Sequence, residues 1–197
     1  MSLLVKICGL REERHVDAAV QAGAGALGFV FAESVRKVTP QIARLIATSV
    51  PRSVKRVAVM LHPANDDWLA VLESFEPDVL QTDADDFDGL EVPATVERWP
   101  VFREGTSAPD APGAFLYEGP KSGRGEAVNW SAAADVARTG QMILAGGLAP
   151  ANVALAIETV RPFGVDVSSG VESSPGQKDS RLIREFVSAA KAAEKRL

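Results

Sequence analysis

The 197-residue sequence has a single cysteine, Cys8, and only two histidines, His15 and His62. One cysteine excludes an internal disulfide and a zinc site with several cysteine ligands, and two histidines argue against a histidine-rich metal site. Basic residues are also in the minority, because 21 Lys and Arg face 26 Asp and Glu and give a formal charge of −5. This balance disfavours a general nucleic-acid binder, while a local basic pocket for a small anion stays compatible with it.

Long hydrophobic runs are missing as well. No uninterrupted apolar run approaches the roughly 20 residues that a membrane helix needs. The first eight residues lack the apolar core and the small-residue cleavage site of a signal peptide. Hydrophobic residues make up 46% of the chain and charged residues 24%, as in average globular proteins. We expect one domain over residues 1–197, a cytoplasmic location with a reduced thiol, and no membrane partner.

What the sequence does contain is an alternation of short apolar runs with longer segments of helical spacing. The predicted strands are Leu3–Cys8, Ala26–Phe31, Arg56–Leu61, Asp78–Thr82, Thr95–Phe102, Ala114–Glu118, Met142–Ala145 and Val165–Ser168. The predicted helices are Glu13–Ala22, a helix from Pro40 capped by Thr39, Asp66–Phe75, Ser131–Arg138, Pro150–Val160 and Asp179–Lys195. Parallel strands joined by helical crossovers account for this order most economically.

Eight such units predict an α/β fold, a single-domain (β/α)₈ TIM barrel. At about 250 residues for a typical barrel, this one is short. The segment 104–113 has two prolines and two glycines and predicts a loop, so a helix is reduced or missing around residues 103–113. The alternative is an open doubly wound sheet. Such a sheet usually has a glycine-rich turn after its first strand, where this chain has only Gly9.

In a (β/α)₈ barrel the functional groups lie at the C-terminal ends of the strands. That rule selects, without family knowledge, Cys8, Arg36, Gln81, Glu118, Gly146, Gly147, Asp166, Ser168, Ser169 and Gly170. The glycine-containing segments after the seventh and eighth strands stand where barrels often bind phosphate through backbone N–H groups. Alternatively, each is a tight turn that simply requires glycine.

Cys8 ends the first strand, and Lys6, two residues earlier, points to the same side. A lone cysteine is commonly a small buried hydrophobe. At this position it is also a candidate thiolate base or nucleophile. We expect the neighbouring Lys6 cation to depress the pKa of the thiol, which strengthens the functional interpretation.

Three charged residues at strand ends have candidate roles. Arg36 suits bidentate binding of a carboxylate, Glu118 suits a general acid with a raised pKa, and Asp166 could orient a substrate N–H or hydroxyl. The alternatives are a solvated loop charge, an exposed strand-end charge and a turn cap. The acidic run 83–88 matches no metal-binding loop, so we expect it to form a solvated face. We expect both histidines to be structural or surface residues.

These motifs, taken together and in order, resemble the phosphoribosylanthranilate isomerase family over almost the whole chain. The segments that carry the resemblance are Lys6-Ile7-Cys8-Gly9-Leu10, Gly28-Phe29-Val30-Phe31 with Ser34 and Arg36, Leu144-Ala145-Gly146-Gly147-Leu148 with Asn152-Val153, and Gly164-Val165-Asp166-Val167-Ser168-Ser169-Gly170-Val171-Glu172 followed by Gly176 and Lys178-Asp179.

The resemblance implies an Amadori rearrangement in tryptophan biosynthesis, without metal or cofactor. N-(5-phosphoribosyl)anthranilate becomes 1-(2-carboxyphenylamino)-1-deoxyribulose 5-phosphate after an acid opens the ribose ring and a base removes the C2 proton. The family's cysteine base matches Cys8, its anthranilate-binding arginine matches Arg36 and its late aspartate matches Asp166. Its phosphate loops match Gly147 and Ser168 to Gly170. The implied partner is a small phosphorylated substrate, and the expected state is a monomer, with a dimer as the alternative.

The sequence departs from the family pattern at several positions. Glu118 stands where the family has an aspartate acid, which keeps the carboxyl group on a side chain one methylene longer. The usual Gln-Leu-His-Gly is Gln81-Thr82-Asp83-Ala84, so the histidine is missing, and Ser-Pro-Arg has become Ser34-Val35-Arg36. Arg124 replaces a small hydroxyl residue. These changes affect substrate positioning more than reaction type.

Two other functions stay open at this point. One is a related sugar-phosphate isomerase of the histidine-pathway type, which typically has two aspartates and two matching phosphate-binding halves. Here the first half, around Gly89 and Pro93, lacks the glycine-serine signature of the second. The other is a non-catalytic barrel that binds a phosphorylated ligand, but the presence of both Cys8 and a carboxylate at 118 argues against it.

Overall fold

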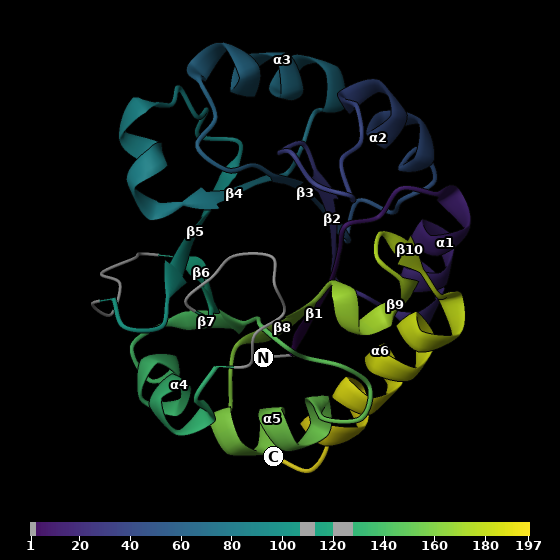
Figure 1. Cartoon of the computed structure of the whole chain (residues 1–197), viewed down its shortest axis with the longest axis vertical. Helices are drawn as coiled ribbons and strands as arrows, with labels where there is room; N and C mark the ends of the chain where they lie inside the picture. Colours follow the sequence, from purple (N-terminus) through teal and green to yellow (C-terminus); the bar gives the residue numbers. More distant parts are fainter. Residues whose placement is uncertain (1–2, 107–112, 120–127) are drawn as a thin grey trace.

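A computed structural model describes residues 3–106, 113–119 and 128–197. Eight parallel strands form a closed barrel in sequence order, as Figure 1 shows along the barrel axis. They are β1 Leu4–Cys8, β2 Ala26–Val30, β3 Lys55–Val59, β4 Val79–Asp83, β5 Glu97–Arg103, β6 Ala114–Glu118, β7 Gln141–Leu144 and β8 Gly164–Val167. The predicted (β/α)₈ barrel and its eight strands are confirmed.

Helices surround the strands on the outside of this ring (Figure 1). They are α1 Glu13–Ala22, α2 Pro40–Ile46, α3 Asn65–Phe75, α4 Trp130–Ala137, α5 Val153–Val160 and α6 Ser180–Glu194. A 3₁₀ helix, η1 Ala84–Gly89, replaces the α-helix between β4 and β5, and a second, η2 Ser169–Val171, follows β8. The predicted gap around residues 103–113 includes residues 107–112, which lie outside the described residues. No described helix is long and apolar enough to cross a membrane.

The helix ends follow the local signals of the sequence, with one exception. Thr39 accepts a hydrogen bond from the Ile42 N–H at 3.3 Å, Pro40 occupies the first turn of α2, and Gly23 ends α1 with φ 88°. The prediction that α5 begins at Pro150 is wrong, because the helix begins at Val153. The residues before it form a turn that belongs to the loop after β7.

Apolar residues fill two regions. One lies between the strands and the helices and includes most of the buried side chains. The other lies inside the barrel and is formed by Ala26, Val57, Val79, Trp99, Val101, Ala114, Leu116, Ile143 and Ala145. Because side chains alternate along a strand, the residues two positions further toward the C-terminal ends also face the interior. The barrel interior is therefore filled by apolar side chains, and the polar side chains of Gln81 and Glu118 follow Val79 and Leu116 toward the C-terminal ends of β4 and β6.

A small hairpin that the sequence did not predict follows η2. Its strands are β9 Glu172–Ser174 and β10 Gln177–Lys178, which pair antiparallel with Lys178 opposite Glu172. Gly176 forms the turn with φ 79°, and a Cβ there would lie 2.7 Å from the Val35 carbonyl oxygen. The hairpin therefore packs directly against the loop between β2 and α2.

Candidate active site

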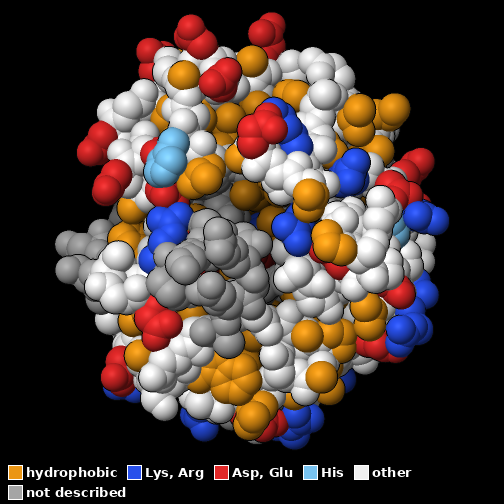
Figure 2. All heavy atoms as spheres, in the orientation of Figure 1, with side chains coloured by type: hydrophobic (Ala, Val, Ile, Leu, Met, Phe, Trp, Pro, Cys, Tyr) orange, Lys and Arg blue, Asp and Glu red, His pale blue; other side chains and the backbone are white. Residues whose placement is uncertain are grey.

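A cavity of about 350 Å³ lies at the C-terminal ends of the strands. Figure 2 shows a hollow near the centre of this face with Lys and Arg side chains at its rim. Nine of the eleven predicted site residues line the cavity, the exceptions being Lys6 and Gly170. The predicted residues that line it are Cys8, Arg36, Gln81, Glu118, Gly146, Gly147, Asp166, Ser168 and Ser169.

The nine residues that line the cavity are far apart in the sequence. The closed barrel brings them together from loops and strand ends that are more than 150 residues apart in the sequence, such as Cys8 and Ser168. The prediction that they share one site is therefore consistent with the geometry.

Beneath the cavity, Lys6 and Asp166 form an ion pair, with 2.8 Å between Lys6 Nζ and Asp166 Oδ1. The pair follows from the strand register, because Lys6 on β1 lies directly opposite Asp166 on β8 and both face the barrel interior. Lys6 is fully buried. A Cβ on Gly28 of β2 would lie 2.9 Å from Cys8 Sγ and 3.2 Å from Lys6 Nζ. The missing side chain at Gly28 thus leaves room for both the thiol and the ammonium group.

The electrostatics of Cys8 correct one prediction. Burial raises the pKa of the Cys8 thiol, and this effect outweighs the lowering of that pKa by the Lys6 cation. Asp166 offsets the lysine further, because its carboxylate also raises the thiol pKa. Burial lowers the pKa of Lys6, but Asp166 and Cys8 bring it above its usual value. The expected net depression of the thiol pKa is therefore wrong, and a pKa raised from its ordinary value of 9.0 keeps Cys8 a protonated thiol at neutral pH.

The loop after β7 has the backbone shape that the two glycines predicted. Gly146 and Gly147 have φ of 89° and 64°, in the left-handed region that glycine adopts without strain. Asn152 fixes the loop, because its Nδ2 donates to the Gly147 carbonyl oxygen at 2.9 Å and its Oδ1 accepts from the Ala149 N–H at 2.8 Å. Backbone N–H groups held in this way suit the binding of phosphate oxygens.

The loop after β8 lies against both the first strand and the loop after β7. Ser168 Oγ donates a hydrogen bond to the Cys8 carbonyl oxygen at 3.2 Å. A Cβ on Gly170 would lie 1.9 Å from the Leu148 carbonyl oxygen. The two glycine-containing loops are therefore in contact, as a phosphate site shared between them requires.

Gln81 and Glu118 line the cavity from the ends of β4 and β6. The Gln81 side chain is buried, and its Oε1 has no hydrogen-bond partner among the described residues. Glu118 ends β6, with its side chain 18% exposed and its Oε1 3.5 Å from Arg103 Nε. Arg103 also forms a bidentate pair with Asp83, at 3.0 and 2.6 Å. Sequence reasoning missed Arg103, which has no signal beyond its place at the end of β5.

The acidic run 83–88 is only partly the solvated face that was predicted. Asp83 pairs with Arg103, and Asp86 accepts hydrogen bonds from Thr82 and from His62, whose Nδ1 lies 2.9 Å from Asp86 Oδ1. The side chains of Asp83 and Asp86 are 14% and 12% exposed. Among residues 3–106, 113–119 and 128–197, no group of His, Cys, Asp and Glu has the arrangement of a metal site. Arg124, a departure from the family pattern, lies outside the described residues.

Arg36 has a partner that the sequence did not reveal. Its Nε and Nη2 donate to the two carboxylate oxygens of Glu172, at 2.7 and 2.9 Å. Glu172 also accepts from Lys178, a buried residue. Glu172 and Lys178 belong to the last family-like segment, but only the pairing of β9 with β10 brings them face to face. The predicted carboxylate clamp is thus held by the protein itself along one edge.

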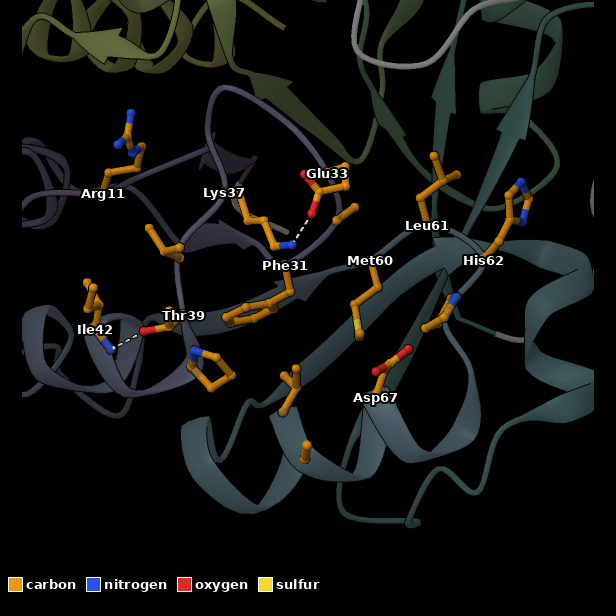
Figure 3. A pocket seen from close by; sticks show the side chains of 16 residues that line it. Arg11, Phe31, Glu33, Lys37, Thr39, Ile42, Met60, Leu61, His62 and Asp67 are labelled. Atoms are coloured by element: carbon orange, nitrogen blue, oxygen red, sulfur yellow. Dashed lines mark hydrogen bonds and ion pairs between the residues drawn. The ribbon is translucent and has the colours of Figure 1, made fainter.

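A larger hollow of about 710 Å³ lies beside the cavity, between the β2–α2 and β3–α3 connections (Figure 3). Phe31 and Met60 form part of its wall, and Glu33 pairs with Lys37 above them. None of the predicted site residues line this hollow. Its lining is mainly apolar, and its charged side chains Arg11, Glu33 and Lys37 have hydrogen-bond partners.

Comparison with known proteins agrees with this geometry. The family model described as N-(5'phosphoribosyl)anthranilate (PRA) isomerase matches residues 5–189. The chain is 39% identical to the N-(5'-phosphoribosyl)anthranilate isomerase of Bordetella petrii, over 100% of this chain and 99% of the relative, and 35% identical to that of Listeria welshimeri, over 98% and 100%.

Solved structures of phosphoribosyl anthranilate isomerases are also similar to this chain. The phosphoribosyl anthranilate isomerase of Thermus thermophilus has a TM-score of 0.84 and 30% identity, covering 96% of this chain and 99% of that one. A phosphoribosyl anthranilate isomerase in complex with reduced 1-(o-carboxyphenylamino)-1-deoxyribulose 5-phosphate has a TM-score of 0.79 and 29% identity, covering 97% and 100%. The chain belongs to the N-(5'-phosphoribosyl)anthranilate isomerase family, whose members are isomerases of tryptophan biosynthesis.

Proposed function

We propose that this cavity converts N-(5-phosphoribosyl)anthranilate to 1-(2-carboxyphenylamino)-1-deoxyribulose 5-phosphate, with Cys8 as the general base and Glu118 as the general acid. The observation that carries the proposal is the convergence of both groups on one cavity with two contacting glycine-containing loops. An aldose-to-ketose rearrangement needs a proton donor for the ring oxygen, a proton acceptor for C2 and a fixed phosphate.

Glu118 donates a proton to the ribose ring oxygen, and the C1–O bond breaks to give a protonated Schiff base. Cys8 then removes the proton from C2. The electron pair of the broken C2–H bond forms the C1–C2 double bond, and the π electrons of the C1–N bond move to nitrogen, which gives a neutral enolamine. Tautomerisation gives the ketone. The reaction needs no external oxidant or reductant, because C1 is reduced as C2 is oxidised.

The protonation state of Cys8 fits this sequence of steps. Before substrate contributes any charge, burial and Asp166 keep the thiol protonated against the influence of Lys6. Ring opening places a positive charge on the Schiff base, and a nearby cation lowers the pKa of a thiol. We infer that the base becomes active as the intermediate forms, with the buried Lys6 ammonium stabilising the thiolate.

The substrate's two anionic ends are assigned to two different groups of lining residues. The phosphate is assigned to Gly146, Gly147, Ser168, Ser169 and Gly170, whose backbone forms the paired loops. The anthranilate carboxylate is assigned to Arg36, and the unpartnered Oε1 of Gln81 is available to a ribose hydroxyl or to the anthranilate N–H. Asp166, which is paired with Lys6, contacts the reacting sugar in this assignment.

The test follows the loss of phosphoribosylanthranilate fluorescence in the wild type and in Cys8→Ser and Glu118→Gln variants. We expect each variant to lose about 10² to 10⁴ in kcat, the usual contribution of a positioned acid or base, with an unchanged unfolding midpoint. Glu118→Asp is the matched control for the acid, and we expect it to stay active because it keeps the carboxyl group. Near-normal turnover in Cys8→Ser would remove Cys8 from the role of base.

We further propose that the enzyme acts as a monomer in the cytoplasm. Every residue assigned to the reaction comes from one chain, and a reducing compartment keeps Cys8 a free thiol. Sedimentation of the active protein tests the first point. A dimer that dissociates with loss of activity would contradict it.

A further inference from the structure

Arg36, the assigned carboxylate clamp, is not a mobile loop cation. Its side chain is 14% exposed, and Nε and Nη2 form the two parallel hydrogen bonds of a fork-shaped pair with Glu172. Among the described residues, Nη1 has no partner. One edge of the guanidinium group is therefore fixed by the protein, and the group lines the substrate cavity.

Glu172 is the centre of a larger network. Besides the two bonds from Arg36, it accepts from Lys178 Nζ at 2.8 Å and from the Gly176 N–H at 3.1 Å. Its side chain is 4% exposed. Four donors on one buried carboxylate satisfy nearly all of its acceptor sites. Glu172 is thus held as firmly as the arginine that it holds.

Lys178 extends the network to the phosphate side. Its Nζ donates to the Ser168 carbonyl oxygen at 2.9 Å and to Ser168 Oγ at 3.2 Å, as well as to Glu172. The ammonium group has three protons, and these three bonds use all of them. The contacts therefore run without interruption from Arg36, through Glu172 and Lys178, to Ser168 in the predicted phosphate loop.

The backbone supports the same connection. The β9–β10 hairpin places Lys178 opposite Glu172, and its turn at Gly176 touches the Val35 carbonyl oxygen in the loop that holds Arg36. A buried ion pair is weak evidence for stability, because desolvation offsets much of its attraction. Its better attested effect is to fix geometry, and here the geometry in question is the separation of two anion-binding groups.

We propose that Glu172 and Lys178 are positioning residues that set the distance between the carboxylate clamp and the phosphate loop. The inference rests on the proposed function, and it adds a basis for specificity. The site selects a ligand whose carboxylate and phosphate match that fixed spacing. Neither residue contacts the reacting atoms in this scheme, so Glu172 acts through Arg36, and Lys178 acts through both Glu172 and Ser168.

The test measures binding rather than turnover. Calorimetry compares two ligands, the reduced product analogue 1-(2-carboxyphenylamino)-1-deoxyribitol 5-phosphate and the same compound without its carboxylate. We expect Glu172→Gln to weaken the first about tenfold, as for loss of one charge-assisted pair, and to leave the second within about twofold. In an Arg36→Ala background, Glu172→Gln should have little further effect, because the residue through which it acts is already absent.

Lys178→Met should weaken both ligands, because it releases Ser168 as well as Glu172. Glu172→Asp keeps the charge and should fall between the wild type and Glu172→Gln, so it tests the proposal even if the glutamine variant folds poorly. Glu185→Gln is the matched control, since Glu185 forms an exposed ion pair with Arg181. We expect this variant to bind both ligands as the wild type does.

Two results would overturn the proposal. One is an equal loss of affinity for both ligands in Glu172→Gln, and the other is an undiminished effect of that substitution in the Arg36→Ala background. A wild type that binds neither ligand would overturn the proposed function and this inference with it. The two results above overturn the inference alone, because in both the wild type still binds its ligands.

Discussion

Gly170 lies so close to Leu148 that a Cβ added to it would be 1.9 Å from the Leu148 carbonyl oxygen and 2.9 Å from its carbonyl carbon. The atoms in contact are backbone, which cannot move aside as a side-chain tip can. The contact joins the loop after β8 to the loop after β7. The spacing of the two loops is thus set by the absence of one side chain.

Gly170→Ala should therefore separate the two loops. We expect a loss of about 1–3 kcal/mol in the free energy of unfolding, the usual cost of overpacking, and a larger loss of affinity for inorganic phosphate. Denaturant unfolding and phosphate titration measure the two effects. Gly89→Ala is the matched control, because a Cβ there would meet no atom within 4 Å. Equal phosphate affinity in the two variants would show that the contact does not shape the site.

The ionisation of Cys8 should report the raised pKa of its thiol. The value of kcat/KM does not isolate it, because turnover needs Glu118 protonated as well as Cys8 ionised, and the two effects of pH oppose each other. Alkylation by iodoacetamide needs only the thiolate, so we expect its rate in the wild type to rise about tenfold per pH unit from neutral pH toward alkaline pH. Cys8→Ser is the control and should not react, because Cys8 is the one cysteine of the sequence. A rate that has levelled off by pH 7 would contradict the prediction.

Acid should weaken the Glu172 network in a defined range. Burial raises the pKa of Glu172, but Arg36 and Lys178 lower it more, from 4.5 to about 2. A folded pKa below the unfolded one stabilises the fold above pH 4.5, and this stability is lost as the pH falls toward 2. At about 1.4 kcal/mol per unit, the pH-dependent contribution is on the order of 3 kcal/mol.

Denaturant unfolding of the wild type and of Glu172→Gln at pH 6, 4 and 2.5 measures that contribution. We expect the difference in unfolding free energy to shrink steadily as the pH falls. Glu185→Gln should differ little from the wild type throughout, since its partner Arg181 is exposed. A difference that stays constant down to pH 2.5 would show that the Glu172 carboxylate is not stabilised by its neighbours.

The fold was predictable because its signals are local and repeated. Each strand is a short apolar run, and a cap such as Thr39 or a stop such as Gly23 marks a helix end within a few residues. The strand-end rule then selected the cavity residues, because a barrel exposes its functional groups at one end. Cys8, Gln81 and Glu118 were found in this way, without knowledge of which side chains touch.

What the sequence could not reveal depends on contacts between distant segments. The pKa of Cys8 depends on how completely the thiol is buried, and burial outweighs the lysine that the strand pattern places beside it. Glu172 pairs with Arg36 across 136 residues, through a hairpin too short to give an alternating pattern. Arg103 approaches Glu118 only because β5 and β6 are neighbours in the barrel.

Substitution of Gln81 should change the stability of the fold and the activity of the enzyme in opposite directions. Its buried Oε1 has no hydrogen-bond partner among the described residues, and such a group costs about 1–3 kcal/mol of stability. Gln81→Met has a similar volume and removes that group. We expect the variant to unfold at a higher denaturant concentration and yet to lose about tenfold in kcat/KM, the usual effect of one lost hydrogen bond to substrate. Gln141→Met, on the exposed first residue of β7, should change neither property. A Gln81→Met variant that is less stable than the wild type would mean that Gln81 supports the fold, and one with normal kcat/KM would remove it from the substrate site.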